Sequence, residues 1–342
     1  MSDAVVLSGA VLKGPFGAGV LDTLTQEETI KALGLNVRRV VGASAGALSA
    51  AYYAAALHAG EEEGAGARLS KLWIDEATVF HSISPSLKAI FGGRGFSTAR
   101  KLRQVMEKGI QPKPGRRHVS LGLVAANLRG SQTKIGNAPA TIHEHVFWFH
   151  AADFSTPEGV EHLFDAISAS AAFPGLFQPV DLRLHGRLAS FVDGGAVNNT
   201  PIRQALGDPM DVERVFVISP TPRVERFSEQ LSGIAYVSQL AEVLIEERLS
   251  RDLRDAAALN EGLLRLQETV PDAEAREKIL EAIGWKGRRI VESIEIRPRR
   301  ALPGTAFSGW IHKDLREEYV AEGRLAAERV VEHYVKHRRN GA

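Results

Sequence analysis

The N-terminal part of the chain contains two short apolar runs, each followed by a glycine-rich turn and a longer stretch of helix-forming residues. Residues 4–7 and 37–41 are rich in valine and too short for helices, so they predict buried strands. A helix that reaches about Leu33 is predicted after the first run, and a helix over residues 47–59 after the second. This alternation of strand and helix predicts a parallel sheet covered by helices.

The middle of the chain adds further elements to this pattern. Residues 119–127 predict a long strand, residues 133–135 a segment that pairs beside it, and residues 215–218 another buried strand. The acidic, glycine-rich stretch 61–67 predicts a solvated turn, and residues 99–108 predict a helix.

The C-terminal third differs in character. Residues 228–286 are charged and rich in leucine, which predicts helices with one solvated face. Residues 290–296 alternate between apolar and polar side chains and predict a half-exposed strand that Pro298 closes. Residues 313–339 predict a terminal amphipathic helix. Since the chain has no repeat and no low-complexity linker, we expect residues 1–342 to form a single domain with a more divergent helical segment at about 228–286.

The composition is that of an ordinary globular protein, with 44% hydrophobic and 24% charged residues. Lysine and arginine number 42 against 41 aspartates and glutamates, and a net charge of +1 gives no reason to expect a nucleic-acid partner. The absence of cysteine excludes disulfides, thiolate catalysis and cysteine-bound zinc. The N-terminus lacks the basic region of a secretory signal and no apolar stretch is long enough to span a bilayer, so we expect a cytoplasmic location.

Candidate chemistry begins with the pentapeptide Gly42-Ala43-Ser44-Ala45-Gly46, which lies between an apolar strand and an alanine-rich helix. A strand that enters a helix through a very tight turn leaves no room for side chains two residues either side of the serine, and it exposes the serine hydroxyl. The positive end of the helix then favours negative charge on the reacting oxygen. The alternative is a crowded joint packed with small residues, because glycine, alanine and serine are common.

Two later stretches have features that are unremarkable when each is taken alone. Asp193 follows an apolar strand and precedes Gly194 and Gly195, a common turn pattern. Residues 167–180 read ISASAAFPGLFQPV and predict a helix end broken by two prolines.

In this order along the chain, these segments resemble those of the patatin-like phospholipases. The resemblance extends to the stretch after the first strand, where matching positions include Ser8, Gly9, Lys13 and Gly14, and to the last strand and last helix of bacterial members. It implies a three-layer α/β/α sandwich with a mostly parallel central sheet. It also implies a serine lipid acyl hydrolase of the phospholipase A, lysophospholipase or esterase type, with no cofactor and no metal.

The resemblance also implies roles for particular residues. Ser44 would be the nucleophile and Asp193 the base, with no intervening histidine. Backbone amides at four positions would form the oxyanion hole: Gly9, Ala10, Val11 and Ala45. Six further residues would shape the nucleophile turn or support the site: Gly42, Gly46, Lys13, Gly14, Gly194 and Gly195. The implied substrate is a lipid or another ester, and the sequence does not identify a protein partner.

Several histidines offer other chemistry. His143, His145 and His150 are spaced like metal ligands, but no clear set of carboxylates accompanies them, and side-chain alternation along a strand explains the spacing better. His312, His333 and His337 follow Asp193, as the third member of an ordinary hydrolase triad would; their helix-like, basic surroundings predict surface positions instead. The glycines from Gly9 to Gly14 have phosphate-loop spacing, but Pro15 stands where the lysine of such a loop is needed.

Two segments bear on membranes. The apolar stretch 81–96 is rich in glycine, serine and proline and suits a buried loop, a lid or a lipid-contacting cap. The run 286–300 carries six basic residues against two glutamates. Such a run is usually a solvated face, but it can also attract an anionic bilayer by about 1 kcal/mol per basic residue. Peripheral contact with an anionic membrane is therefore a second expectation.

The loop Gly9-Ala10-Val11 departs from the three consecutive glycines usual in the family. If the family backbone requires positive φ at either of the last two positions, alanine or valine would strain it by about 1–3 kcal/mol. An oxyanion donor would then rest turned away from the substrate. This departure favours an alternative function, a catalytically weak protein that binds lipid or a partner.

We therefore expect low basal turnover, and a higher kcat in the double variant Ala10→Gly/Val11→Gly. Loss of one oxyanion donor typically costs about 10²–10³ in kcat, which sets the gain available. The measurement is turnover of a short-chain nitrophenyl ester, with labelling of Ser44 by a fluorophosphonate retained in both proteins. A fast wild-type enzyme, or a double variant no faster than wild type, would show that the loop is already well formed.

Overall fold

The fold is that of a computed structural model of the chain. The described residues are 2–9, 13–77, 95–97, 100–115, 117–135, 138–184, 186–207, 212–222, 233–304 and 308–340. Ala10 and Val11, most of the apolar stretch 81–96 and the start of the helix expected at 99–108 lie outside these ranges.

An eight-stranded sheet forms the centre of the protein, in the order β10-β9-β1-β2-β4-β8-β7, and β5 pairs along the edge of β4 opposite to β2 and β8. The five strands β10, β9, β1, β2 and β4 run parallel, and β5, β8 and β7 are antiparallel to their neighbours. The strands are β1 (Asp3–Leu7), β2 (Val37–Ala43), β4 (Ser120–Ile135), β5 (Ala138–Phe149), β7 (Val180–Leu184), β8 (Arg187–Asp193), β9 (Arg214–Ile218) and β10 (Glu292–Ile296). A separate two-stranded sheet joins β3 (Gly95–Ser97) and β6 (Gly175–Phe177).

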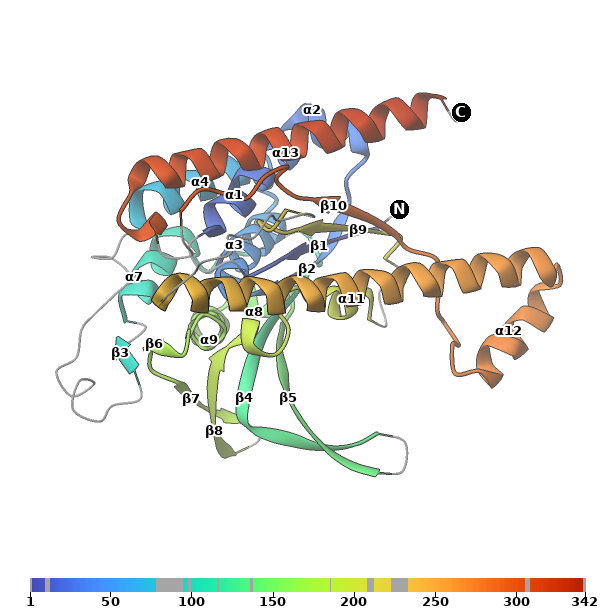
Figure 1. The fold of residues 1–342 in the computed structure, drawn as a ribbon, viewed down its shortest axis with the longest axis horizontal. Coiled ribbons are helices and arrows are strands. Elements are labelled where there is room, and N and C mark those ends of the chain that lie inside the picture. Colours follow the sequence, from blue (N-terminus) through green and yellow to red (C-terminus); the bar gives the residue numbers. More distant parts are fainter. Residues whose placement is uncertain are drawn as a thin grey trace.

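Helices cover both faces of the sheet (Figure 1). On one face α1 (Gly14–Leu24), α3 (Ala45–Ala59) and α13 (Lys313–Asn340) share a core with Val5 and Leu7 of β1. On the other face α10 (Ile202–Leu206) and α11 (Gly233–Thr269) pack against Ala4 and Val6. Successive β1 residues thus enter two different cores, which explains why this parallel strand is continuously apolar. The remaining helices are α2 (Glu27–Leu33), α4 (Ala65–Glu76), α7 (Arg100–Gly109), α8 (Ala151–Ser155), α9 (Pro157–Ser170) and α12 (Ala273–Ala282).

The three-layer α/β/α arrangement and the mostly parallel sheet are confirmed. The prediction of one helix that runs to Leu33 is wrong in one respect, because the structure has two helices there, α1 and α2. Gln26 has an extended backbone (φ −73°, ψ 140°) that ends α1 and starts α2. The buried side chain of Thr25 at this break accepts a hydrogen bond from the N–H of Gly66 (3.0 Å), so the interruption anchors the start of α4.

The solvated turn expected at residues 61–67 is also corrected, because α4 already begins at Ala65. Ala65 and Gly66 are buried, and a Cβ added to Gly66 would lie 2.1 Å from the backbone nitrogen of Asp22. The small residues therefore permit a close approach of α4 to α1 and do not mark a loop.

Residues 133–135 do not form a separate pairing segment. They are the far end of β4, which continues past an irregularity between Ala126 and Ser131, and they pair with the start of β5. Gly130 at this irregularity has a φ of +69°. Because glycine is uncommon inside a strand, the sequence pattern does not show that the strand continues past it. The β4–β5 ribbon extends well beyond the body of the sheet (Figure 1).

The helical expectation for the segment 228–286 is confirmed over the described residues by α11 and α12. Asp272, the N-cap of α12, accepts hydrogen bonds from the backbone of Glu274 and Ala275 and separates the two helices. The second half of α11 and all of α12 project from the layers (Figure 1). Within the described ranges, no helix combines the length and the apolar character needed to cross a membrane.

Candidate active site

Ser44 occupies the turn between β2 and α3 with a strained backbone. Its φ is +53° and its ψ is −128°, and among the described residues it is the only one other than glycine with a positive φ. Such a conformation costs of order 1–3 kcal/mol in a residue with a side chain. Surrounding contacts must therefore hold the turn, and strain of this kind is typical of functional sites.

The glycines two residues either side of Ser44 make this turn possible. A Cβ on Gly42 would lie 2.5 Å from the carbonyl oxygen of Gly46. A Cβ on Gly46 would lie 2.2 Å from the carbonyl oxygen of Leu7 at the end of β1. Both positions therefore exclude any larger residue, and the first turn of α3 packs directly on the carboxyl end of the neighbouring strand.

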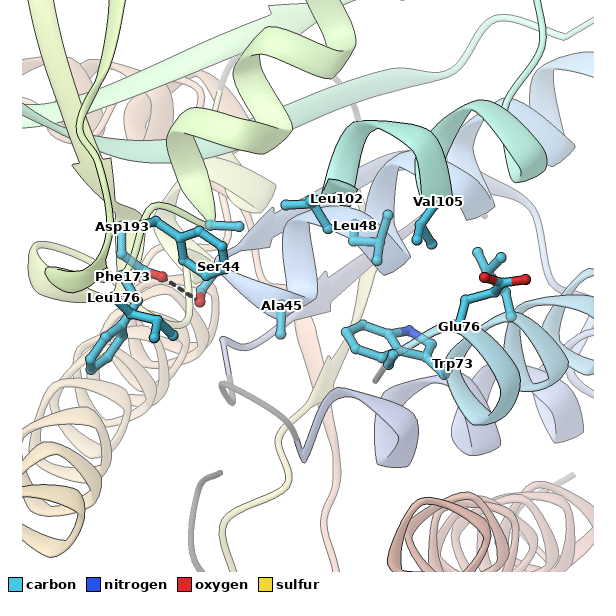
Figure 2. A pocket seen from close by; sticks show the side chains of 14 residues that line it. Ser44, Ala45, Leu48, Trp73, Glu76, Leu102, Val105, Phe173, Leu176 and Asp193 are labelled. Atoms are coloured by element: carbon cyan, nitrogen blue, oxygen red, sulfur yellow. Dashed lines mark hydrogen bonds between the residues drawn. The ribbon is translucent and has the colours of Figure 1, made fainter. Parts of the chain in front are cut away.

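Asp193, the last residue of β8, faces Ser44. The Ser44 hydroxyl donates a hydrogen bond to Oδ2 of Asp193 at 2.6 Å, and both side chains are buried (Figure 2). The other carboxylate oxygen, Oδ1, accepts the N–H of Gly195 at 2.7 Å. A Cβ on Gly194 would lie 2.1 Å from the carbonyl oxygen of Val124, so this glycine lets the aspartate turn pack against β4.

Strand register brings the two residues together. β5 pairs with one edge of β4, and β2 and β8 follow each other along the opposite edge, where Ala43 is paired with Val124 and Asp193 with Ala125. Consecutive residues of β4 thus locate the Ser44 turn and the aspartate.

Burial raises the pKa of Asp193 from 3.8 to about 6, while the hydrogen bonds from Ser44 and Gly195 act in the opposite direction. At pH 7 the carboxylate is still mostly ionised, but it is more basic than an exposed aspartate. This combination suits a group that must accept a proton.

Ser170 is a residue of the site that the sequence did not identify. Its buried hydroxyl accepts the N–H of Ser44 at 2.9 Å and donates to the carbonyl oxygen of Val124 at 2.5 Å. It therefore fixes the strained serine to β4 from the end of α9. The stretch 167–180 that contains it was notable for its small residues and prolines, but nothing in that pattern distinguishes Ser170 from the nearby Ser168.

The other expected site residues lie around this pair. The N–H of Gly9 donates to the carbonyl oxygen of Asn199 at 2.9 Å, so in this arrangement that amide is already engaged. Lys13 is largely buried at the start of α1, and a Cβ on Gly14 would lie 2.7 Å from the ring of Trp73. Ala45 is the first residue of α3 and lines the cavity beside Ser44.

A largely apolar cavity opens at the Ser44–Asp193 pair and passes between helices α3, α4 and α7 (Figure 2). Leu48, Trp73, Leu102 and Val105 line its length, and Phe173 and Leu176 lie beside Asp193. Glu76 lies at the far end, where its carboxylate binds Lys108 at 2.7 Å. The cavity thus suits an extended apolar group that reaches the serine.

The histidines that the structure describes lie elsewhere. No histidine within the described ranges lines this cavity. His312, His333 and His337 are exposed, and the last two contact each other on α13. His143 bonds to the carbonyl oxygen of Asn127, and among the described residues no group of three side chains is arranged to hold a metal.

The fold and this site define an α/β protein with a serine–aspartate pair at the carboxyl edge of a mostly parallel sheet. Residues 5–206 match the family profile described as patatin-like phospholipase, and the chain belongs to this family. No match was found among curated proteins.

Solved structures of two proteins show partial likeness. VipD from Legionella pneumophila has 13% identity and a TM-score of 0.42, with 97% of this chain and 66% of VipD covered. The type III effector ExoU has 12% identity and a TM-score of 0.31, with 97% and 53% covered. ExoU in its heterodimeric complex with SpcU, from the type III secretion system of Pseudomonas aeruginosa, has 16% identity and a TM-score of 0.30, with 96% and 68% covered. The chain thus spans only half to two thirds of these proteins.

The raised pKa of Asp193 predicts a pH-dependent cost to stability. The folded-state pKa of about 6 lies above the unfolded value of about 3.8, so the folded protein holds this proton more tightly. The resulting loss of stability is absent below about pH 4 and complete above about pH 6. In Asp193→Asn the cost disappears, so the free energy of unfolding of the variant relative to wild type should rise across this window, by up to about 3 kcal/mol.

Urea unfolding of both proteins between pH 4 and pH 7 measures this difference. A stability difference for Asp193→Asn that stays constant with pH would contradict the raised pKa.

Proposed function

We propose that the protein is a serine lipid acyl hydrolase that cleaves carboxylic esters, of the phospholipase A, lysophospholipase or esterase type. Ser44 is the nucleophile and Asp193 is the base, with no metal or organic cofactor. The observation that carries the proposal is the 2.6 Å hydrogen bond between the two side chains, at the opening of an apolar cavity.

The reaction proceeds through an acyl-enzyme. The Ser44 hydroxyl oxygen attacks the ester carbonyl carbon as its proton passes to Oδ2 of Asp193, and the carbonyl oxygen becomes an oxyanion. When this intermediate collapses, the bond to the leaving alcohol breaks and Asp193 returns the proton to the alcohol oxygen. A water molecule then attacks the acyl-serine with Asp193 again as base, and it releases the carboxylic acid and restores the serine.

Stabilisation of the oxyanion is assigned to backbone amides near Ser44. Ala45 begins α3, so its N–H belongs to a helix N-terminus that favours negative charge. The loop Gly9-Ala10-Val11 supplies the remaining donors. Because the N–H of Gly9 is bonded to Asn199, these donors are assigned to Ala10 and Val11.

The apolar cavity is assigned to the acyl chain of the substrate. Leu48, Trp73 and Val105 offer only hydrocarbon and aromatic surface along it, apart from the indole N–H, which donates to Ser49 at 3.0 Å. A bound acyl chain would gain about 0.8 kcal/mol for each methylene removed from water. The head group of a lipid substrate would remain outside the cavity.

The proposed protein also contacts an anionic membrane peripherally, but through only part of the basic run 286–300. Strand β10 divides this run, so its first basic residues precede the strand and its last ones follow it. Five strand residues separate the two groups by roughly 17 Å. Arg299 and Arg300, which are exposed, follow the carboxyl end of β10, the same edge of the sheet as Ser44. They are the basic residues best placed to meet the membrane that holds the substrate.

The test combines turnover of a nitrophenyl ester with fluorophosphonate labelling. Ser44→Ala should abolish both, because it removes the attacking oxygen. Asp193→Asn should lower kcat by orders of magnitude, because asparagine cannot accept the proton. Ser70→Ala removes another buried hydroxyl, on α4, and should leave activity near wild type.

Alanine at His312, His333 or His337 should also leave activity nearly unchanged. A large loss of turnover in one of these variants, without unfolding, would show that the site is a triad that contains histidine and not a dyad. Full turnover in Ser44→Ala would reduce Ser44 to a packing residue. Lipid binding by wild type without turnover or labelling would favour the catalytically weak binding protein suggested by Ala10 and Val11.

A further inference from the structure

Asn199 lies six residues after Asp193 and makes two backbone-directed contacts with Gly9. Its side-chain Nδ2 donates to the carbonyl oxygen of Gly9 at 2.7 Å, and its own carbonyl oxygen accepts the N–H of Gly9 at 2.9 Å. The side chain is almost completely buried, with 3% exposed. Both backbone polar groups of Gly9 are therefore held by one residue.

The same side chain also approaches the aspartate turn. A Cβ added to Gly195 would lie 2.8 Å from Oδ1 of Asn199 and 2.9 Å from Oδ1 of Asp193. A Cβ added to Gly9 would lie 2.2 Å from Oδ1 of Asn199 and 2.8 Å from the Cβ of Ser44. Asn199 is thus packed between the turn that carries the base and the residue that leads into the oxyanion loop beside the nucleophile.

The segment from Asp193 to Asn199 is itself tightly bonded. The N–H groups of Val197 and Asn198 both donate to the carbonyl oxygen of Gly194, at 3.1 and 2.8 Å. One residue further on, the buried hydroxyls of Thr200 and Ser8 are hydrogen-bonded at 2.7 Å. A displacement of the aspartate turn would therefore be transmitted toward Gly9 through two neighbouring contacts, from Asn199 to Gly9 and from Thr200 to Ser8.

We propose that Asn199 is a positioning residue that couples the Asp193 turn to the oxyanion loop, so that the base and the oxyanion donors keep one relative geometry. The atoms of a peptide unit are coplanar, so a donor that holds the Gly9 carbonyl restrains rotation of the whole unit that begins the loop. The constraint matters more here because the sequence continues with Ala10 and Val11 where the family usually has glycines. The proposal rests on the proposed hydrolase function.

The test compares Asn199→Ala with Asn198→Ala, a matched control from the same turn. Asn198 is equally buried, but its amide bonds to Gln204 (3.2 Å) and Glu144 (3.4 Å) and not to Gly9. Active-site concentration is set by the end-point of fluorophosphonate labelling, and kcat is expressed per labelled site. Asn199→Ala should lower this kcat about 10²-fold, as misplaced catalytic groups do, with a much smaller change in KM. Asn198→Ala should keep the wild-type kcat per site, even if it lowers stability.

A second variant separates positioning from packing. Asn199→Asp keeps the size of the side chain but removes the donor to Gly9 and adds a negative charge near Asp193. Its kcat per site should be at least as low as that of Asn199→Ala, and the acid limb of its kcat/KM profile should move to higher pH, because a second carboxylate disfavours ionisation of Asp193. In Asn199→Ala the limb should stay at the wild-type position, since the contacts of Asp193 with Ser44 and Gly195 remain.

A wild-type kcat per site in Asn199→Ala, or an equal loss in Asn198→Ala, would overturn the proposal. If Asn199→Ala does not fold, a folded Asn199→Asp with wild-type kcat per site would overturn it equally. Failure of the hydrolase function is distinguishable, because it would appear before any Asn199 variant is compared, as wild type without turnover and labelling or as turnover that survives in Ser44→Ala.

Discussion

The register of β4 is the constraint on which the site depends. Along one edge of this strand Val124 pairs with Ala43 and the next residue, Ala125, pairs with Asp193, and these pairings define the separation of the Ser44 and Asp193 side chains. The Val124 carbonyl also accepts the hydroxyl of Ser170, which in turn holds the N–H of Ser44. A shift of one residue in this register would move Asp193 to the opposite face of the sheet. The buried apolar faces on both sides of the sheet make such a shift very costly.

Burial at this position has two opposed effects on Asp193. It raises the pKa to about 6, which makes the carboxylate a stronger base for the serine proton. It also destabilises the folded protein at neutral pH, because the charge is removed from water. The strained φ of Ser44 adds to the cost. Both costs lie at the same site, at the two residues proposed as the base and the nucleophile.

Local pattern predicted much of this molecule. Continuous valine-rich runs indicated strands buried on both faces, and the glycines around Ser44 indicated a tight turn whose crowding the structure bears out. The family resemblance supplied Asp193, which alone reads as an ordinary turn. The sequence could not locate Ser170 or Asn199, because their roles arise from contacts with residues distant in the chain. It also missed the break at Gln26 and the length of β4, where a helix packing contact and a glycine-containing irregularity override the local pattern.

The central claim is that a buried aspartate, and no histidine, activates Ser44. The pH dependence of kcat/KM for a soluble ester tests it most directly, because this profile reports the ionisation of the free enzyme. The account predicts a fall of about tenfold per pH unit below about pH 6, at the pKa of Asp193, and the same profile after each of His312, His333 and His337 is replaced by alanine. A limb near pH 4, or one that moves when a histidine is replaced, would contradict the account.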